Sequence, residues 1–476
     1  MTQHTPPVLP SPPEGLPATL GDLRADGHRY RTVHEELHDN LLTALREGRH
    51  RFRGIVGMDE TVLPQLERAL LAGHDVVLLG ERGQGKTRLA RSLVDLLDEW
   101  TPFVEGCEIN DHPYEPVCAR CRRLAAEQGD GLPVAWKHRS ERYGEKLATP
   151  DTSVGDLIGD VDPVRIAQGR TLGDPETIHF GLVPRTNRGI VVVNELPDLA
   201  ERIQVSLLNV LEERDLQVRG YTIRLPLDLF VVATANPEDY TNRGRIITPL
   251  KDRFGAELRT HYPLELDDEI ELVSQEAELV ASVPRVLLDI IARFTRAVRE
   301  SPSVDQRSGV SARFAIAAAE HVAACALRRA ALCDEPEAVA RVCDLDSVLP
   351  TLRGKVEFER SEEGREDEVL GHLLRVSTAA AYREHASGLD VSGFTDRIAD
   401  GVQIETGDLV PATRVLEQLG PVSGLSAVLS AFGVDGEPTP GQAASAIELV
   451  LEGLYLSRRV GKETVADGRS VYGGAS

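Results

Sequence analysis

Apolar residues form short unbroken runs in the first part of the chain and recur at helical spacing in the rest. Three runs rich in Val and Leu lie at residues 75–79, 189–193 and 229–234. Runs without polar alternation are typical of strands buried on both faces of a parallel sheet. Amphipathic patterns at residues 87–99 and 203–213 predict helices between them. Alternating strands and helices predict a doubly wound α/β domain.

The same pattern divides the chain into four segments. Residues 1–52 form an N-terminal tail and a helical lead-in, and we expect the Pro-rich first 22 or so to be disordered or loosely attached. Residues 53–265 form the α/β core, with an insertion at about 101–170 that is too long for a simple loop. Beyond the core we expect helices, in a segment at 266–345 and a C-terminal region at 346–476.

Composition narrows the functional classes. The chain has 476 residues, with 53 basic and 76 acidic side chains and a formal net charge of −23, which disfavours general nucleic-acid binding. Aromatic residues make up 4% of the chain, so its cores depend on aliphatic side chains. The chain has no apolar run of the roughly 18–20 residues that span a bilayer, and its start lacks the apolar region of a signal peptide. We therefore expect a cytoplasmic protein without a membrane span.

The first motif with clear chemistry follows the strand predicted at residues 75–79. Residues 80–87 fit the phosphate-binding pattern G-x-x-x-x-G-K-[ST], in which backbone N–H groups wrap phosphates at the start of a helix. Lys86 would neutralise the β- and γ-phosphates of ATP, and Thr87 would bind the accompanying Mg²⁺. A chance Gly-rich turn is the alternative, but both the strand and the helix that the motif needs are predicted here. The loop residues are Gly80, Glu81, Arg82, Gly83, Gln84, Gly85, Lys86 and Thr87.

A second motif ends the strand predicted at residues 189–193. Asn194 and Glu195 stand where P-loop ATPases carry an Asp-Glu pair. Glu195 can orient and polarise an attacking water, whereas neutral Asn194 lacks the Coulombic attraction of a carboxylate for Mg²⁺. The alternative is a protein that binds nucleotide and hydrolyses it slowly or not at all.

Further polar residues lie downstream of these motifs. Asn236 ends the strand predicted at 229–234 and is a candidate to position water, with a turn-forming Asn as the alternative. Arg253 could reach nucleotide on a neighbouring subunit as an arginine finger, or could pair with Asp252. Arg313 could contact phosphate from the helical segment, or could simply begin a helix. Two residues compete with Arg253 for the finger role, Arg243 and Arg245.

The spacing of the cysteines indicates a metal-binding site rather than a set of disulfide bonds. Within the insertion, Cys107, His112, Cys118 and Cys121 lie in fifteen residues, and Cys118 and Cys121 have the C-x₂-C spacing of structural zinc sites. Four such ligands could close one tetrahedral Zn²⁺ site, and the alternative is a group of reduced, partly buried thiols beside an unrelated His. We interpret the remaining three cysteines as packing residues: Cys325, Cys333 and Cys343.

In order and spacing, these motifs resemble the I subunit of magnesium chelatase and the related MoxR-type AAA+ ATPases. The resemblance covers about residues 52–330, and its closest stretches are residues 55–59, 80–87, 180–190, 206–213, 235–239 and 250–255. It implies an AAA+ core, an insertion in the second helix that ends near Gly181 and Leu182, a hairpin at about 215–225 and an α-helical lid at 266–345. It also implies a hexameric ring that acts with a partner bearing a von Willebrand A domain, which we expect to be a separate polypeptide.

Three functions therefore remain open. The leading one is an ATP-hydrolysing AAA+ motor subunit of a chelatase-like or MoxR-like remodelling complex, with an unknown protein or metallation client. An AAA+ activator that remodels an alternative sigma factor is a rival, but the chain contains neither a Gly-Ala-Phe-Thr-Gly-Ala loop nor a recognisable basic helix-turn-helix. A nucleotide-gated scaffold with little hydrolysis is another, because Asn194 departs from the usual Asp. Chelation of magnesium into a porphyrin does not follow from the motor alone.

Overall fold

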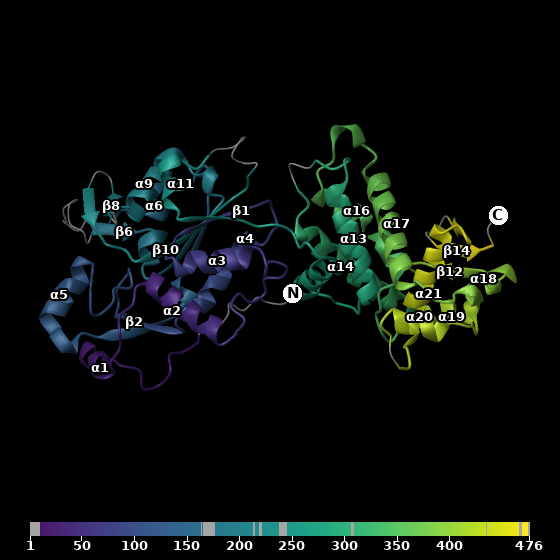
Figure 1. Ribbon diagram of the computed structural model, residues 1–476, viewed down its shortest axis with the longest axis horizontal. Helices are drawn as coiled ribbons and strands as arrows, with labels where there is room; N and C mark the ends of the chain where they lie inside the picture. Colours follow the sequence, from purple (N-terminus) through teal and green to yellow (C-terminus); the bar gives the residue numbers. More distant parts are fainter. Residues whose placement is uncertain are drawn as a thin grey trace. The chain divides into compact units, whose positions relative to one another are not determined.

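The computed structural model describes residues 10–162, 164, 177–212, 215–218, 221–237, 245–305, 309–434, 436–465 and 469–474. At 215–218 and 221–224 it describes the backbone alone. The chain divides into two compact units, Met1–His261 and Tyr262–Ser476 (Figure 1). None of the helices in these described ranges has the length and apolar character of a membrane span.

A five-stranded parallel sheet forms the centre of the first unit. Its strands, in spatial order, are β11 (Ala256–Arg259), β1 (Val76–Leu79), β10 (Leu229–Ala235), β7 (Gly189–Asn194) and β4 (Tyr143–Leu147). Every residue of β1, β7 and β10 is buried. The three strands predicted from unbroken apolar runs are confirmed, and they are the three inner strands of the sheet.

Helices cover both faces of this sheet, because alternate side chains of each strand point to opposite sides. Val76 and Leu78 of β1 pack with α2 (Val33–Arg46), α3 (Val62–Leu71), α4 (Lys86–Ser92) and η1 (Leu93–Leu96). Val77 and Leu79 belong to the core that includes α8 (Leu182–Arg185), α9 (Glu201–Glu212) and α11 (Thr248–Arg253). Figure 1 shows α2 and α3 on one side of the sheet and α9 and α11 on the other. The predicted doubly wound domain is confirmed.

The segment between α4 and β7 differs from the predicted insertion at 101–170, because β4 belongs to the central sheet. The added part is an antiparallel pair, β2 (Trp100–Val104) and β3 (Val134–His138), joined through α5 (Ala119–Gln128) and η2 (Gly129–Gly131). A short η3 (Arg139–Arg142) leads into β4. The sequence Tyr-Gly-Glu-Lys-Leu of β4 carries charges at its centre, so an apolar-run criterion does not detect it.

Two further strand pairs lie outside the central sheet. After α6 (Val154–Leu157), β5 (Gly159–Val161) pairs with β6 (Ile178–Phe180), and β6 ends directly before Gly181. A hairpin of β8 (Asp215–Val218) and β9 (Tyr221–Arg224) follows α9. Both positions agree with the insertion end and the hairpin that the family resemblance implies.

Residues 17–20 are attached to the first unit, contrary to the expectation of a loose segment up to about residue 22; residues 1–9 of that segment lie outside the described residues. The helix α1 (Leu20–Ala25) begins where the Leu20 N–H donates to the Leu132 carbonyl at 2.9 Å. Trp136 Nε1 donates to the Pro17 carbonyl at 2.8 Å. These bonds add the preceding chain to the edge of β3, a partner that the Pro-rich composition does not reveal.

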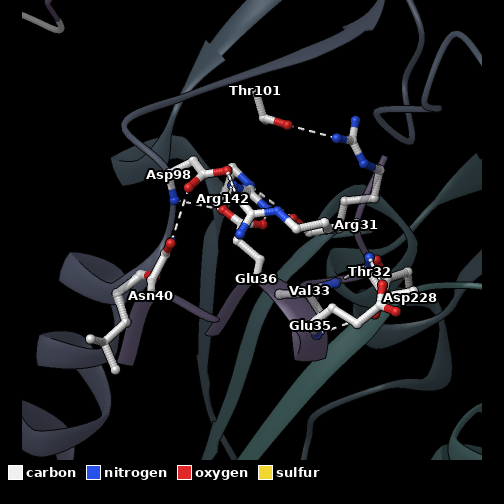
Figure 2. A network of polar contacts seen from close by, with 12 residues as sticks. Arg31, Thr32, Val33, Glu35, Glu36, Asn40, Asp98, Thr101, Arg142 and Asp228 are labelled. Atoms are coloured by element: carbon white, nitrogen blue, oxygen red, sulfur yellow. Dashed lines mark hydrogen bonds and ion pairs between the residues drawn. The ribbon is translucent and has the colours of Figure 1, made fainter. Parts of the chain in front are cut away.

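A buried ion pair joins α2 to η3, which lies directly before β4. The Arg142 guanidinium donates two hydrogen bonds to the Glu36 carboxylate, at 2.7 and 2.6 Å, and their side chains are 3% and 6% exposed. Glu36 also accepts from the Asp98 N–H at 2.6 Å, and Asp228 accepts from the Val33 N–H at 2.8 Å. Figure 2 shows this polar network between α2 and the segments that lead into β2, β4 and β10.

We expect Glu36→Ala to lower the free energy of unfolding of the first unit by about 3–5 kcal/mol, because it leaves the Arg142 guanidinium buried without its carboxylate. Tryptophan fluorescence during urea unfolding measures this directly, since both tryptophans, Trp100 and Trp136, lie in this unit. Glu47→Ala, at an exposed helix end, is the matched control and should change stability by less than about 0.5 kcal/mol. Equal effects of the two substitutions would contradict the assignment of the buried pair.

The second unit packs around one continuous core that runs from Ile270 to Tyr472. The predicted lid and the predicted C-terminal region therefore form one compact body rather than two. An antiparallel sheet in the order β12-β14-β13 adds strands to a region expected to be helical. The described elements of the second unit are α12 (Leu266–Glu276), α13 (Arg285–Glu300), α14 (Ala312–Cys333), α15 (Val342–Ser347), α16 (Leu349–Leu352), η6 (Arg353–Lys355), η7 (Arg360–Glu362), α17 (Glu366–His385), α18 (Ser392–Ala399), β12 (Ile404–Thr406), α19 (Ala412–Leu419), α20 (Leu425–Ala431), α21 (Pro440–Leu456), β13 (Gly461–Thr464) and β14 (Ser470–Gly473).

Candidate nucleotide-binding site

The phosphate-binding motif forms the turn between β1 and α4. Gly83 and Gly85 have φ angles of 77° and 75°, in the left-handed region that only glycine enters without strain. Gly80 is required for a different reason: a Cβ there would lie 2.0 Å from Thr260 Oγ1 and 2.3 Å from Gln84 Oε1. The motif glycines thus match the backbone that the site needs.

Gln84 holds the loop in shape. Its side-chain Oε1 accepts hydrogen bonds from the Glu81 N–H and from Thr260 Oγ1, both at 3.0 Å. Thr260 follows β11, so the loop is fastened to the neighbouring strand of the sheet. The motif pattern allows any residue at this position, and the sequence therefore did not indicate the structural role of Gln84.

The start of α4 brings the two residues expected to meet MgATP into place. Lys86 is 6% exposed, and its ammonium donates to the carbonyl oxygens of Gly80 and, at 2.8 Å, of Glu81. Thr87 Oγ1 donates to Asn194 Oδ1 at 3.4 Å. This contact joins the loop to the second motif, 107 positions away in the chain.

Asn194, at the end of β7, lies in a network that includes a carboxylate. Its Oδ1 accepts from Thr234 Oγ1 at 3.2 Å, and its Nδ2 donates to Glu145 Oε1 at 2.7 Å. Glu145 lies on β4, and its other oxygen accepts from Arg91 Nε and the Tyr143 hydroxyl, each at 2.9 Å. The hydrogen bond to Glu145 raises the pKa of Arg91.

Glu145 is the functional candidate that the sequence did not reveal. Because β4 lies beside β7, with Leu147 opposite Asn194, it places a carboxylate next to the position where the usual Asp is missing. The sequence analysis did not predict β4 as a strand of the central sheet. A charged residue within such a strand would have pointed to Glu145.

Glu195 has an unusual backbone conformation. Its φ and ψ angles are 54° and 50°, in the left-handed region, and its N–H donates to Thr234 Oγ1 at 3.1 Å. Such backbone strain in a non-glycine residue costs roughly 1–3 kcal/mol and clusters at functional sites. Asn236, 5% exposed, directly follows β10, whose residue Ala233 pairs with Val193. Glu195 and Asn236 therefore leave neighbouring strands at the same edge of the sheet as the phosphate-binding loop.

The arginine candidates occupy different parts of the chain. Arg253 ends α11 with a side chain 43% exposed, and its nearest described ion-pair partner is Glu212, at 3.7 Å, rather than Asp252. Arg245 is also exposed, and Arg243 lies outside the described residues. Arg313 is exposed near the start of α14 in the second unit, where its N–H donates to Ser311 Oγ at 3.1 Å. The roles expected for these arginines remain predictions.

The cysteine group comes together, but with a different fourth residue. Cys107, Cys118 and Cys121 place their sulfur atoms beside a carboxylate oxygen of Asp111. The neighbouring His112 does not belong to this group. Its Nδ1 accepts a hydrogen bond from the Tyr114 N–H at 3.0 Å, and its Nε2 lies 3.2 Å from His28 Nε2. The predicted Cys₃His set is therefore replaced by a Cys₃Asp set. In the second unit, Cys325, Cys333 and Cys343 are free thiols.

Comparisons with known proteins place this site in context. The family model described as the Sigma-54 interaction domain matches residues 171–253. Magnesium-chelatase subunit ChlI of Guillardia theta is 29% identical over 235 residues, covering 48% of this chain and 62% of the relative. The 38 kDa magnesium-chelatase subunit of Rhodobacter capsulatus is 27% identical over 365 residues, covering 74% and 93%. ChlI of Nostoc sp. is 28% identical over 242 residues, covering 50% and 61%. The chain thus spans about three-fifths of the first ChlI relatives.

Solved structures give weaker similarities. The complex between subunits BchI and BchD of magnesium chelatase includes a chain with 22% identity and a TM-score of 0.35, covering 66% of this chain and 98% of that chain. NtrX from Brucella abortus aligns with 13% identity and a TM-score of 0.37, covering 74% and 68%. TM-scores below 0.5 do not establish a fold, so the fold assignment depends on the sheet topology and the motifs. Together with the sequence similarities, these features identify the chain as an AAA+-type P-loop protein that resembles the I subunit of magnesium chelatase.

Proposed function

We propose that the chain is an ATP-hydrolysing AAA+ motor subunit. The observation that supports this best is the contact between Thr87 of the phosphate-binding loop and Asn194 at 3.4 Å, with Glu195 next in the chain. It brings a phosphate-binding element and a candidate water-activating carboxylate to one sheet edge, where parallel α/β proteins bind ligands.

One set of groups in the chain would bind the phosphates of ATP, and another would bind Mg²⁺. Lys86 presents a buried ammonium to the β- and γ-phosphates, and the loop N–H groups bind phosphate oxygens. Thr87, Asn194 and Glu145 offer oxygen atoms, the ligand type that Mg²⁺ prefers, so this set fits the ion directly or through its waters. When bound, Mg²⁺ neutralises charge on the phosphates.

Glu195 and Asn236 act on the attacking water in this account. The Glu195 carboxylate accepts a proton from water that is aligned with the γ-phosphate, and Asn236 orients that water from the neighbouring strand. The left-handed backbone of Glu195 ends the strand at this residue. Both roles are part of the proposal.

The assembly is a second element of the proposal. Arg253 is exposed on the first unit and would complete the site of a neighbouring subunit in a ring, which the family resemblance suggests is hexameric. We also propose that Arg313 contacts phosphate. The relatives support a chelatase-like complex, and the solved complex joins BchI to BchD. We extend this to a separate partner with a von Willebrand A domain, in a chelatase-like or MoxR-like machine.

A second candidate function is an activator that remodels an alternative sigma factor. The match of residues 171–253 to the Sigma-54 interaction domain favours it. The chain nevertheless lacks the Gly-Ala-Phe-Thr-Gly-Ala sequence of such activators. Direct binding of sigma-54 in the presence of an ATP analogue would support this candidate over the first.

Affinity capture with Glu195→Gln in ATP tests the proposed assembly. This variant should hold ATP without hydrolysing it, and so should trap the ring with its partner and client. The wild type in ADP is the matched control and should return the chain with less of either. If the variant returns only monomer at concentrations where ATP is bound, the remodelling proposal is contradicted.

We expect Glu145→Gln to raise the Mg²⁺ concentration needed for half-maximal ATP turnover by about 10–100-fold, because the carboxylate that contacts Asn194 loses its charge. Glu141→Gln, at an exposed position four residues earlier, should leave the Mg²⁺ dependence unchanged. Asn194→Asp combined with Glu145→Gln returns a carboxylate to the site. This double variant should therefore need a Mg²⁺ concentration for half-maximal turnover close to that of the wild type. An unaltered Mg²⁺ titration of Glu145→Gln would exclude this role.

A further inference from the structure

The insertion between β2 and β3 contains a compact group of side chains that the nucleotide site does not use. The Sγ atoms of Cys107, Cys118 and Cys121 and a carboxylate oxygen of Asp111 all lie within 4.8 Å of one another. Two thiolates bound to one tetrahedral Zn²⁺ at 2.3 Å would be about 3.8 Å apart. The four atoms are therefore close enough to surround a single metal ion.

Asp111 gives independent evidence for a ligand at this point. Asp111 is 0% exposed, and a buried carboxylate is costly unless its charge is paired. Its Oδ2 accepts from the N–H groups of Val117 and Cys118, at 3.1 and 2.9 Å. Its Oδ1 is buried and has no hydrogen-bonding partner among the described residues. A cation held by the neighbouring sulfurs would satisfy this oxygen.

The backbone supports thiolates rather than neutral thiols. The Asp111 N–H donates to Cys107 Sγ, and the Cys121 N–H donates to Cys118 Sγ, both at 3.3 Å. Cys118 is the N-cap of the ten-residue helix α5, where the helix dipole favours negative charge. Arg120 Nη1 lies 3.9 Å from Cys121 Sγ and adds positive charge at the edge of the group.

We propose that Cys107, Asp111, Cys118 and Cys121 bind one structural Zn²⁺ ion. Three thiolates and a carboxylate suit a tetrahedral zinc site, and four protein ligands leave no open position for catalysis. The site closes the loop between β2 and α5 and fixes it to the start of that helix.

The loop that this metal closes lies against the approach to β7. Asn110 Nδ2 donates to the Arg185 carbonyl at 2.7 Å, and Asn187 Nδ2 donates to the Ile109 carbonyl at 2.9 Å. Arg188 Nη1 donates to the Pro102 carbonyl at 2.6 Å. Residue 189 begins the strand that ends in Asn194. Zinc would therefore stabilise the segment that leads into β7, the strand that ends in the second motif. It would not be part of the nucleotide site.

Metal analysis of the full-length chain, purified without added metal, tests the proposal. We expect about one Zn²⁺ per chain by elemental analysis, and a Co²⁺-substituted protein with thiolate charge-transfer bands and the intense d–d bands of a tetrahedral site. Removing Zn²⁺ with a chelator should lower the Tm of the first unit, followed by tryptophan fluorescence, by about 5 °C or more. Returning Zn²⁺ should restore it.

Substitutions separate this ligand set from its neighbours. Cys118→Ser and Asp111→Asn should lose most of the bound Zn²⁺, whereas His112→Gln and Cys325→Ser should keep it. Wild-type protein that purifies without zinc and fails to bind Co²⁺, that contains iron with sulfide, or that shows a disulfide within this group under reducing purification would overturn the proposal. So would Zn²⁺ that survives Asp111→Asn but is lost in His112→Gln.

Discussion

Glu195→Gln is expected to lower ATP turnover by about 10²–10⁴-fold while ATP remains bound, because the amide cannot accept the proton of the attacking water. The substitution keeps the size of the side chain, and the Glu195 N–H that donates to Thr234 is unchanged. Phosphate release in steady state measures the turnover, and titration with a fluorescent ATP analogue measures the binding.

A nearby glutamate provides the control for this experiment. Glu201 is exposed at the start of α9, and Glu201→Gln should turn over ATP at the wild-type rate. If Glu195→Gln hydrolyses ATP as fast as the wild type, another group must activate the water. In that case the assignment of Glu195 is wrong.

Lys86→Ala is expected to weaken ATP binding by about 30-fold or more, which corresponds to the roughly 2–5 kcal/mol lost when one partner of a buried charge pair is removed. The ammonium is 6% exposed and donates to the carbonyls of Gly80 and Glu81, so it is positioned over the loop that should wrap the phosphates. Calorimetric titration with ATP in excess Mg²⁺ gives the dissociation constant.

The matched control removes a cation from the same unit without approaching the loop. Arg68 is exposed on α3, and Arg68→Ala should bind ATP as the wild type does. An unaltered affinity in Lys86→Ala, with the protein folded by tryptophan fluorescence, would show that nucleotide does not bind at this loop.

The sequence predicted the inner part of the fold well, because its determinants are local. Buried strands of a parallel sheet read as apolar runs, and the phosphate-binding motif specifies its own turn through Gly83 and Gly85. The motifs assigned Lys86, Thr87, Asn194 and Glu195 to one nucleotide site, and the contact between Thr87 and Asn194 agrees with that assignment.

The parts that were not predicted depend on contacts between distant segments. The strand β4 contains Glu145 and Lys146, so it lacks the apolar run that would reveal it, and the carboxylate beside Asn194 was missed with it. The composition of the N-terminal segment does not reveal that Glu36 forms a buried pair with Arg142, 106 positions away. Neither interaction has a local signature.

The candidate metal site shows the same limit at short range. The C-x₂-C spacing pointed to Cys118 and Cys121, whose sulfur atoms do lie close together, but adjacent residues on a loop point in different directions. Whether Asp111 or His112 joins the sulfurs depends on the turn between residues 107 and 118, which hydrogen bonds to Asp111 Oδ2 hold in place. The sequence analysis included His112 because it lies among the cysteines and histidine is a usual zinc ligand.

The most direct test of the account is steady-state phosphate release by the full-length wild type, measured with Mg²⁺, after chelation of Mg²⁺, and beside Glu195→Gln. The account predicts release that requires Mg²⁺ and is lost in the variant. Equal rates near background for the wild type and Glu195→Gln, with ATP bound to both, would contradict it and would indicate a protein that binds nucleotide without using its hydrolysis.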